Sequence, residues 1–335
     1  MKRPRRIRLP RAMNLPKPTS TLKRSPVRPG RAPARLAALG LLAGLVAAGP
    51  ARATPAGFAF LEIPAGARAS SMAGAYSSIA QGAEAAFWNP AGLAEVRGVQ
   101  VSANHAEMFA DLRYDAMSVG TGLWGGGLGM SVRAYYSDAI DQRDDLGNLT
   151  GSFGSHDLEF KLSYGHRLAS GFSLGGSTQL VRERIADESA QTWAFDAGAS
   201  WDPPILDGSR LSLSLHNLGR AGHFTIDGVP GGDVPLPKAV QTGLSMAHLF
   251  GHGLTLRGSL EGRFAEGASG IGMLGTEITA LGGGALRAGW RINDASSNFT
   301  LGAGYATQSV HFDYAFVPWQ FDLGDSHRFS VDLQF

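Results

Sequence analysis

The chain ends in Arg328-Phe329-Ser330-Val331-Asp332-Leu333-Gln334-Phe335, where polar and apolar residues alternate without a break. Successive side chains of a strand point to opposite faces, so the apolar residues of this stretch would share one face. The pattern recurs in segments of about ten residues, the length at which a tilted strand crosses a bilayer. We therefore predict an all-β fold, a transmembrane antiparallel β-barrel, with the terminal Phe335 as a C-terminal barrel signal.

The number of strands follows from the alternating segments after residue 98. Fourteen such segments can be counted, although the pattern alone leaves 12 or 16 strands open. The predicted strands are roughly 99–105, 113–123, 127–138, 155–167, 171–184, 193–202, 210–218, 239–250, 253–264, 271–281, 284–293, 298–308, 310–319 and 326–335.

The connections between these strands differ in length. Two are long, at residues 139–154 and 219–238, and most of the alternate ones are tight turns such as Gly282-Gly283. Outer-membrane barrels have long extracellular loops and short periplasmic turns. We therefore expect both long loops to face outward and the tight turns to face the periplasm, with 203–209 as a longer exception.

Charged residues of the strands fall mainly on the polar face, which lines the lumen in a barrel. An Arg or Lys facing lipid near the midplane would cost about 2–4 kcal/mol, which favours the inward placement. We expect opposite charges to pair there, while a charge ladder that conducts substrate is the alternative. The inward set is Glu159, Lys161, Arg182, Arg184, Asp196, Arg257, Glu261, Arg263, Glu277, Arg287, Arg291, Asp313 and Asp332.

The first 53 residues have the organisation of a secretory signal peptide. Residues 1–35 hold twelve Lys and Arg and no acidic residue, and an apolar run follows at 36–49. Ala51-Arg52-Ala53 then fits the small-x-small cleavage rule. The basic segment is unusually long, so either Met1 or Met13 could be the start. The destination implied by a signal peptide and a barrel is the cell outer membrane.

Removal of residues 1–53 changes the charge of the chain. The whole sequence has 30 Lys and Arg against 28 Asp and Glu, and 13 of the basic residues lie before residue 54. The mature chain therefore has 17 basic and 28 acidic residues, a net charge of −11. We expect no nucleic-acid partner. The chain also has no cysteine, which excludes disulfides, thiolate metal sites and a lipoprotein anchor.

Residues 54–98 form a separate segment, rich in small residues and without strand alternation. Two elements in it, Gly66-Ala67-Arg68 with Gly74 and Trp88-Asn89-Pro90-Ala91-Gly92-Leu93, resemble the N-terminal region of the PorV/PorQ family. They resemble more loosely the same region of FadL-like (TodX-type) barrels. Ala73 stands where the family pattern commonly has glycine. The resemblance implies a barrel at 99–335 whose segment 54–98 folds inside the lumen as a hatch.

The resemblance also implies function. A PorV/PorQ-like protein would be a scaffold or shuttle associated with type IX protein secretion, with secretion components or cargo as partners. The alternative is a FadL-like channel for long-chain fatty acids or other hydrophobic molecules, with such a molecule as ligand. Outer-membrane lipid and, through the C-terminal strand, the barrel-assembly machinery are expected partners of either.

Motifs of enzymes lack their structural context. Gly171-Phe172-Ser173-Leu174-Gly175 matches G-x-S-x-G, and Gly120 to Gly125 matches G-x-G-x-x-G, but no helix is predicted after either. The nine histidines show no metal-binding spacing, and the acidic residues of 138–145 lack the EF-hand pattern. We expect a protein that is not an enzyme, with no catalytic residue, cofactor or metal.

Overall fold

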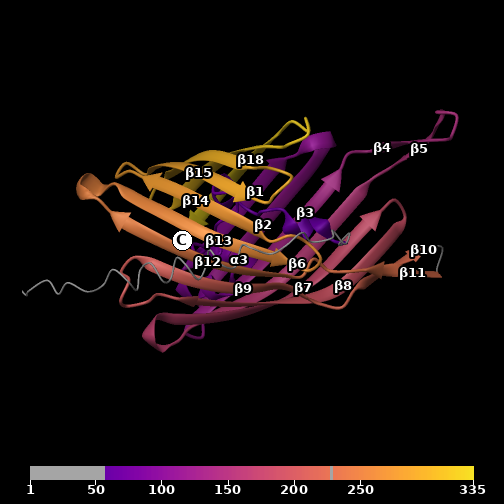
Figure 1. Cartoon of the computed structure of the whole chain (residues 1–335). Helices are drawn as coiled ribbons and strands as arrows, with labels where there is room; N and C mark the ends of the chain where they lie inside the picture. The colour runs from indigo at the N-terminus through magenta and orange to yellow at the C-terminus, as the bar shows by residue number, and fades with distance from the viewer. Residues whose placement is uncertain (1–56, 227–228) are drawn as a thin grey trace, which may run out of the picture. The chain divides into compact units, whose positions relative to one another are not determined.

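The structure, a computed structural model, describes residues 57–226 and 229–335. The predicted signal peptide lies outside the described residues. Within them, fourteen antiparallel strands form a closed barrel (Figure 1). The barrel strands are β1 (Val99–Glu107), β2 (Leu112–Leu123), β3 (Gly126–Ser137), β6 (Ser155–Arg167), β7 (Phe172–Ile185), β8 (Glu188–Trp201), β9 (Ser209–Gly219), β12 (Ala239–Leu249), β13 (Thr255–Ala265), β14 (Ile271–Thr279), β15 (Gly284–Ile292), β16 (Phe299–Ala306), β17 (Val310–Pro318) and β18 (Asp325–Gln334).

The barrel closes where the last strand pairs with the first. Val101 of β1 lies opposite Leu333 of β18, and the terminal Phe335 donates its N–H to the carbonyl of Val99 at 2.9 Å. The predicted fold class is confirmed, and the count of fourteen replaces the alternatives of 12 and 16. The bounds of the strands agree within two residues except for β8, which begins at Glu188 instead of 193.

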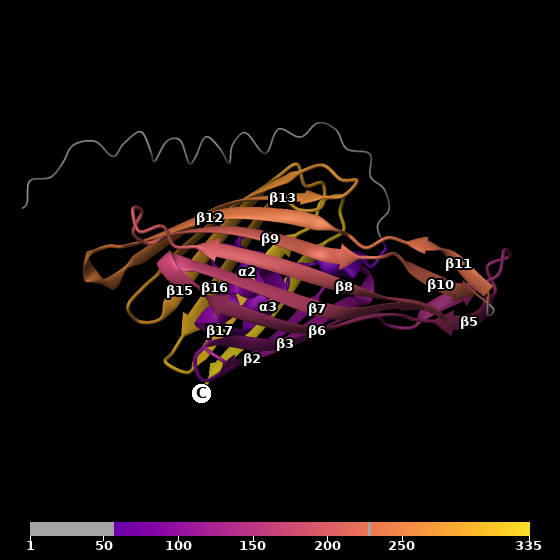
Figure 2. The same ribbon diagram turned by 90° about the horizontal axis from the view of Figure 1, so that it is seen from below.

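Both long loops contain hairpins that were not predicted from the sequence. β4 (Ile140–Arg143) pairs with β5 (Leu149–Phe153), and β10 (Gly222–Ile226) pairs with β11 (Val229–Val234). β10 also pairs with β8 beyond the end of β9, so this hairpin extends the barrel wall. Figure 2 shows both hairpins on the side of the barrel away from the C-terminus. We call this side the loop end, and the side with Val99 and Phe335 the terminal end.

The alternation predicted from the sequence places polar side chains inside and apolar ones outside. On β18, Arg328 and Ser330 are buried, whereas Phe329 between them is 52 % exposed. On β6, Glu159 and Lys161 are buried and Phe160 is exposed. The barrel therefore presents an apolar outer wall that suits a lipid environment. The backbone N–H and C=O groups of its strands are paired in hydrogen bonds between neighbouring strands.

Arg182 and Arg184 depart from the predicted inward placement. Both lie on the outward face of β7 and are exposed, while their neighbour Val181 is buried on the inner face. They occupy the last four residues of a 14-residue strand, longer than the ~9–11 residues that cross a bilayer. A strand of this length extends beyond the hydrocarbon, which is the physical reason why a charged side chain near its end can face outward. Arg184 forms a long ion pair with Asp187 at 3.7 Å.

The segment before β1 lies inside the barrel as short helical turns. These are η1 (Ala59–Glu62), α2 (Ala67–Ser71), η2 (Gly82–Glu84), α3 (Ala85–Trp88) and η3 (Pro90–Glu95). Most residues from 58 to 96 are buried. Among the described residues, no helix has the length and the apolar content needed to cross a membrane. We call residues 57–98 the hatch.

Candidate hatch and ligand cavity

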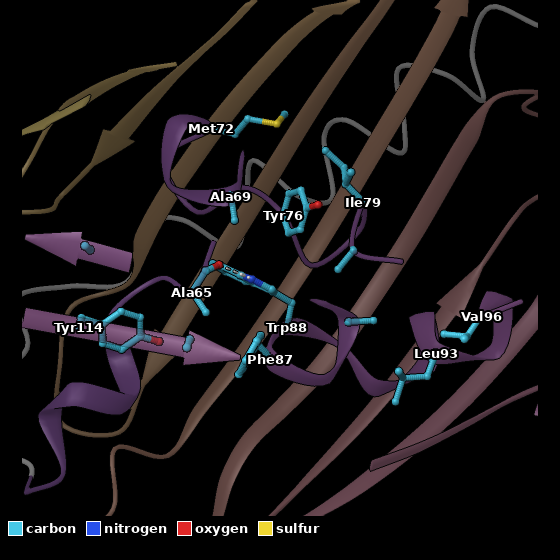
Figure 3. Close-up of a cluster of buried hydrophobic side chains, with 14 residues drawn as sticks. Ala65, Ala69, Met72, Tyr76, Ile79, Phe87, Trp88, Leu93, Val96 and Tyr114 are labelled. Atoms are coloured by element: carbon cyan, nitrogen blue, oxygen red, sulfur yellow. Dashed lines mark hydrogen bonds between the residues drawn. The ribbon is translucent and has the colours of Figure 1, made fainter. Parts of the chain in front are cut away.

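The hatch has an aromatic and apolar core, shown in Figure 3. The rings of Tyr76 and Trp88 meet edge to face with centroids 5.7 Å apart. Trp88 Nε1 donates a hydrogen bond to the carbonyl of Ala65 at 3.0 Å, which joins the second resemblance motif to the residue just before Gly66. Tyr114 of β2 belongs to the same buried cluster. The core is therefore shared between the hatch and the barrel wall, which holds the hatch in one position.

The Asn89-Pro90 turn is bonded to the wall at β8. Asn89 Nδ2 donates to the carbonyl of Ala199 at 3.1 Å, and Asn89 Oδ1 accepts from the N–H of Ala91 at 3.1 Å. The second bond caps η3, in which Pro90 takes the first position and needs no N–H partner. Asn89 is 1 % exposed. This motif therefore fixes the hatch to the side wall, and η3 then leads the chain toward β1.

Glycines of the wall make room for this turn. On three adjacent strands, β6, β7 and β8, the inward residues that face the turn are Gly165, Gly175 and Gly198. An added Cβ would lie 2.3 Å from Pro90 O at Gly165 and 2.1 Å from Asn89 Oδ1 at Gly198. We call these three residues the glycine track. Without side chains there, the hatch backbone packs directly on the wall.

Two further residues of the motif complete this contact. The side chain of Leu93 is fully buried against the inner face of β3 and β6. Gly92 lies within the hatch itself, where a Cβ would come 2.2 Å from the carbonyl of Ala80. Close packing inside the hatch therefore accounts for a glycine at this position.

The other resemblance motif contacts the opposite part of the wall. Gly66 has φ +94, which glycine adopts without strain, and it precedes α2. The N–H of Ala67 donates to Ser330 Oγ at 2.6 Å. Arg68 forms a bidentate pair with Glu277 of β14, with distances of 2.8 and 2.7 Å. Planar two-point pairing of this kind fixes orientation as well as distance.

A tight bend after α2 rests on a second carboxylate. Ala73 and Gly74 both have positive φ, 58 and 80. The N–H groups of Ser77 and Ser78 then donate to Glu261 of β13 at 3.0 and 2.9 Å. Glu261 is 1 % exposed, so both hydrogen bonds are shielded from water. The hatch is thus anchored at three separate places on the wall.

Charges inside the barrel form compact pairs between neighbouring strands. Lys161 contacts Glu159 at 3.0 Å and Asp196 at 2.7 Å, and Arg133 contacts Glu159 at 2.8 Å. Arg133 also donates to the hatch carbonyls of Leu61 and Phe87. Buried ion pairs that make such additional hydrogen bonds hold neighbouring strands and the hatch in register. In a charge ladder that conducts substrate, the charged side chains would instead be accessible from the lumen. We interpret these charges as structural.

A cavity of about 280 Å³ lies between the hatch and the wall at the loop end. Its apolar lining includes Trp88 of the hatch and Met273, Val317 and Trp319 of the wall. Its charged lining consists of Glu62, Arg263, Arg291, Asp294 and Arg328. We call this the loop-end cavity. A concave, mostly apolar space with convergent polar groups is the general form of a small-molecule site.

Two other cavities lie on the terminal side of the hatch. One of about 190 Å³ is lined by Arg68, Tyr76 and Glu84, and one of about 330 Å³ is lined by Ser78 and Arg257. The hatch therefore separates spaces at the two ends of the barrel. Any molecule that passed through the lumen would have to move part of the hatch.

Glu84 is a buried hatch carboxyl group with a displaced titration. Burial and, to a smaller extent, the nearby carboxylate of Asp332 raise the pKa of Glu84 to about 8. Arg68 and a hydrogen bond from the Tyr76 hydroxyl, 2.9 Å from Oε2, act in the opposite direction. The other oxygen, Oε1, is buried without a hydrogen-bond partner among the described residues. At neutral pH this carboxyl group is therefore mostly protonated.

The enzyme-like motifs lie in strand and turn. Ser173 is buried near the start of β7, and Gly120 to Gly125 run from β2 into the turn before β3. Neither has the following helix that its motif requires. Within residues 57–226 and 229–335, no group of three or more metal-ligating side chains is assembled.

Comparison with known proteins supports the fold. The family described as "Uncharacterised protein family (UPF0164)" matches residues 47–192, and no curated protein matches the sequence. Among solved structures, the "CymD monoaromatic hydrocarbon channel" has a TM-score of 0.56 at 14 % identity and covers 82 % of this chain and 98 % of its own. The toluene transporter TbuX of Ralstonia pickettii has a TM-score of 0.55 at 13 % identity, covering 81 % and 98 %.

The toluene transporter TodX of Pseudomonas putida gives the same result, with a TM-score of 0.56, 14 % identity and coverage of 80 % and 96 %. The chain therefore has the same outer-membrane β-barrel fold as these three proteins. Its closed strands and apolar outer wall suit that membrane, and the predicted localisation is confirmed.

The wall residues of the site were not among the residues predicted from the sequence. The glycine track could have been found, because glycine recurs at inward positions of adjacent predicted strands. The loop-end cavity could not, because its residues come from separate strands whose register only the folded barrel defines.

Proposed function

We propose that the protein is a non-enzymatic channel that admits small hydrophobic molecules through the outer membrane past its hatch. The observation that carries this proposal is the loop-end cavity. Trp88, Met273, Val317 and Trp319 give it an apolar surface, and its volume of about 280 Å³ suits a compact molecule. The likeness of the fold to hydrocarbon and toluene transporters supports the same function.

Passage requires the hatch to move, because it separates the cavities at the two ends. A covalent link between hatch and wall tests this requirement. Ser78 Oγ lies 3.0 Å from Ser259 Oγ of β13, so cysteines at both positions would be within disulfide range. The natural chain has no cysteine, so the link would form without competition. Uptake is measured in whole cells with a hydrophobic dye whose fluorescence rises on reaching the inner membrane.

We expect the oxidised double variant Ser78→Cys/Ser259→Cys to lose most dye uptake and to regain it with reductant. The two single variants serve as controls and should respond to neither reagent. Undiminished uptake by the fully oxidised double variant would show that the hatch is not the gate, and the channel proposal would lose its mechanism.

A secretion scaffold or shuttle of the PorV/PorQ type is the second candidate. It rests on the resemblance of residues 60–94 and gains no support from the solved structures. The exposed β4–β5 and β10–β11 hairpins would be the surface offered to cargo. If the protein is a shuttle, deletion of residues 140–153 should abolish surface delivery of cargo without changing dye uptake. If it is a channel, the same deletion should leave dye uptake unchanged and should affect the delivery of no cargo protein.

Two partners are proposed for either function. Outer-membrane lipid would contact the apolar outer wall. The barrel-assembly machinery would recognise the C-terminal strand that ends in Phe335, whose side chain is 76 % exposed on the outside of the barrel. Replacement of Phe335 by a polar residue should reduce the amount of folded protein in the membrane.

A further inference from the structure

Arg328 of β18 is a buried arginine that lines the loop-end cavity. Its side chain points into the lumen and the residue is only 4 % exposed. Nη1 donates to the carbonyl of Pro64 at 3.1 Å and to Ser70 Oγ at 3.0 Å, and Nε donates to Ser326 Oγ at 3.3 Å. All three acceptors are neutral. No hydrogen bond joins Nη2 to any residue within the described part of the chain.

The other arginines of this cavity have carboxylate partners. Arg263 pairs with Glu62 at 3.2 Å, and Arg291 pairs with Asp294 at 2.9 Å. Among the described residues, none offers a carboxylate within 4.0 Å of Arg328. The cavity therefore contains three guanidinium groups and two carboxylates, and the charge that is left over belongs to Arg328.

The same contrast holds for the buried arginines elsewhere in the lumen. Arg133 contacts Glu159 at 2.8 Å, and Arg287 contacts Glu277 at 2.7 Å and Asp313 at 2.6 Å. Burial of a charge without an opposite charge is costly, and neutral acceptors compensate only part of that cost. An arginine cannot avoid the cost by losing its proton. A negative charge brought into the cavity would complete the site.

We propose that the ligand of the loop-end cavity is a small hydrophobic carboxylate whose anionic group is bound by Arg328. The apolar part would pack on Trp88, Met273 and Val317, which line the same cavity. This inference rests on the proposed function, since it specifies which hydrophobic molecules the channel takes. A carboxylate matches the fork of donors on a guanidinium better than any neutral group.

Binding of a carboxylate to Arg328 would also affect the contacts of the hatch. Nη1 of Arg328 holds Pro64 O and Ser70 Oγ, which both belong to the hatch. A carboxylate is a stronger acceptor than a neutral carbonyl or hydroxyl, because charge-assisted hydrogen bonds are roughly twice as strong. The ligand would therefore compete with the hatch for the same donors.

Two probes of equal shape and different charge test the proposal. Benzoate and benzamide are titrated calorimetrically into the full-length protein in detergent at neutral pH. We expect benzoate to bind roughly tenfold more tightly or better, as a hydrogen bond to a charged group predicts. Arg328→Met should remove this preference by weakening benzoate alone. Arg328→Lys should retain part of it. The control Arg167→Met, which removes an ion pair with Asp202 outside the cavity, should leave it unchanged.

The outcomes separate this inference from the function on which it rests. Equal affinity of the wild-type protein for both probes, or an unchanged preference in a folded Arg328→Met variant, would overturn the role of Arg328. The channel would still stand if benzamide binds and dye uptake depends on the hatch. Absence of binding by both probes together with hatch-independent uptake would remove the proposed function as well. Folding of each variant is checked by the heat-dependent shift in gel mobility that folded barrels show.

Discussion

The carboxylate of Glu261 on β13 accepts hydrogen bonds from the N–H groups of both Ser77 and Ser78, at 3.0 and 2.9 Å. Two successive hatch amides thus depend on one wall side chain. We predict that Glu261→Gln loosens the hatch, because a neutral amide accepts more weakly and turns an N–H group toward one of the donors. We use hatch docking for the packing of the hatch against the inner wall of the barrel. The substitution should weaken hatch docking by about 1–3 kcal/mol.

Docking can be measured through a reporter cysteine at Ser71, which is fully buried in α2. In the Ser71→Cys background, Glu261→Gln should raise the rate of maleimide labelling while the barrel stays folded. Glu266→Gln is the matched control, because Glu266 lies just beyond β13 and its side chain is 71 % exposed. Equal labelling of all three proteins would contradict an anchoring role for Glu261.

The glycine track gives a second prediction. Gly198→Ala would place a Cβ 2.1 Å from Asn89 Oδ1, and Gly175→Ala would place one 2.3 Å from the carbonyl carbon of Pro90. The hatch backbone must then move away from β7 or β8, so labelling of the reporter cysteine should rise. Gly258→Ala has open space around its Cβ and should change nothing. If the track variants behave like this control, the close packing is not required for docking.

These contacts show what the sequence could predict. The strands were predictable because lipid outside and polar groups inside force a two-residue period on each of them. Arg182 and Arg184 escaped that rule, since the period says nothing about where a long strand leaves the membrane. The partners of the hatch were not predictable. Arg68 and Glu277 are 209 residues apart, and only the closed barrel brings them together.

The resemblance motifs lie within the segment that we call the hatch, but the resemblance does not give the reason for each residue. Gly66 is explained by its positive φ and Asn89 by its two hydrogen bonds, and both are local features that a motif can encode. Arg328 carried no such signal. It alternates with Phe329 like any inward residue, and its lack of a carboxylate becomes visible only when all its neighbours are placed.

Ala73 gives a third prediction, because it has φ +58 where the family pattern commonly has glycine. A non-glycine residue in this left-handed region costs roughly 1–2 kcal/mol. We therefore expect Ala73→Gly to stabilise hatch docking by up to about 1 kcal/mol, since added backbone freedom offsets part of the gain. Slower labelling of the reporter cysteine would agree with this, and faster labelling would show that the buried methyl group contributes more than the strain costs.

The orientation of the barrel gives a fourth prediction. The loop end, which carries the β4–β5 hairpin, should face outward, and the terminal end should face the periplasm. A cysteine at Asn148, in an exposed turn of that hairpin, should react with an impermeant maleimide on whole cells. A cysteine at Asp207, exposed in the connection between β8 and β9, should react only after cell disruption. The reverse pattern would mean that the barrel is inverted.

The last prediction concerns pH and follows from the buried carboxyl of Glu84. Its folded pKa of about 8 is above the value of 4.5 for a free side chain. Below about pH 4.5 both states are protonated, and the contribution of this group to docking is fully present. As the pH rises toward 8 the released group ionises while the docked one still holds its proton, so docking weakens progressively. Asp332 and Asp313 oppose ionisation of the docked group, whereas Arg68 and Tyr76 favour it.

Labelling of the reporter cysteine should therefore rise between pH 5 and pH 9 by more than the thiol chemistry alone explains. Glu84→Gln in the same background supplies the comparison, because it keeps the shape of the side chain and cannot ionise. The ratio of the two labelling rates removes the intrinsic pH dependence of the thiol. We expect this ratio to increase with pH and to level off above about pH 8, where the docked carboxyl has lost its proton. A ratio that stays constant across the range would show that Glu84 keeps its proton, or loses it, equally in the docked and released hatch.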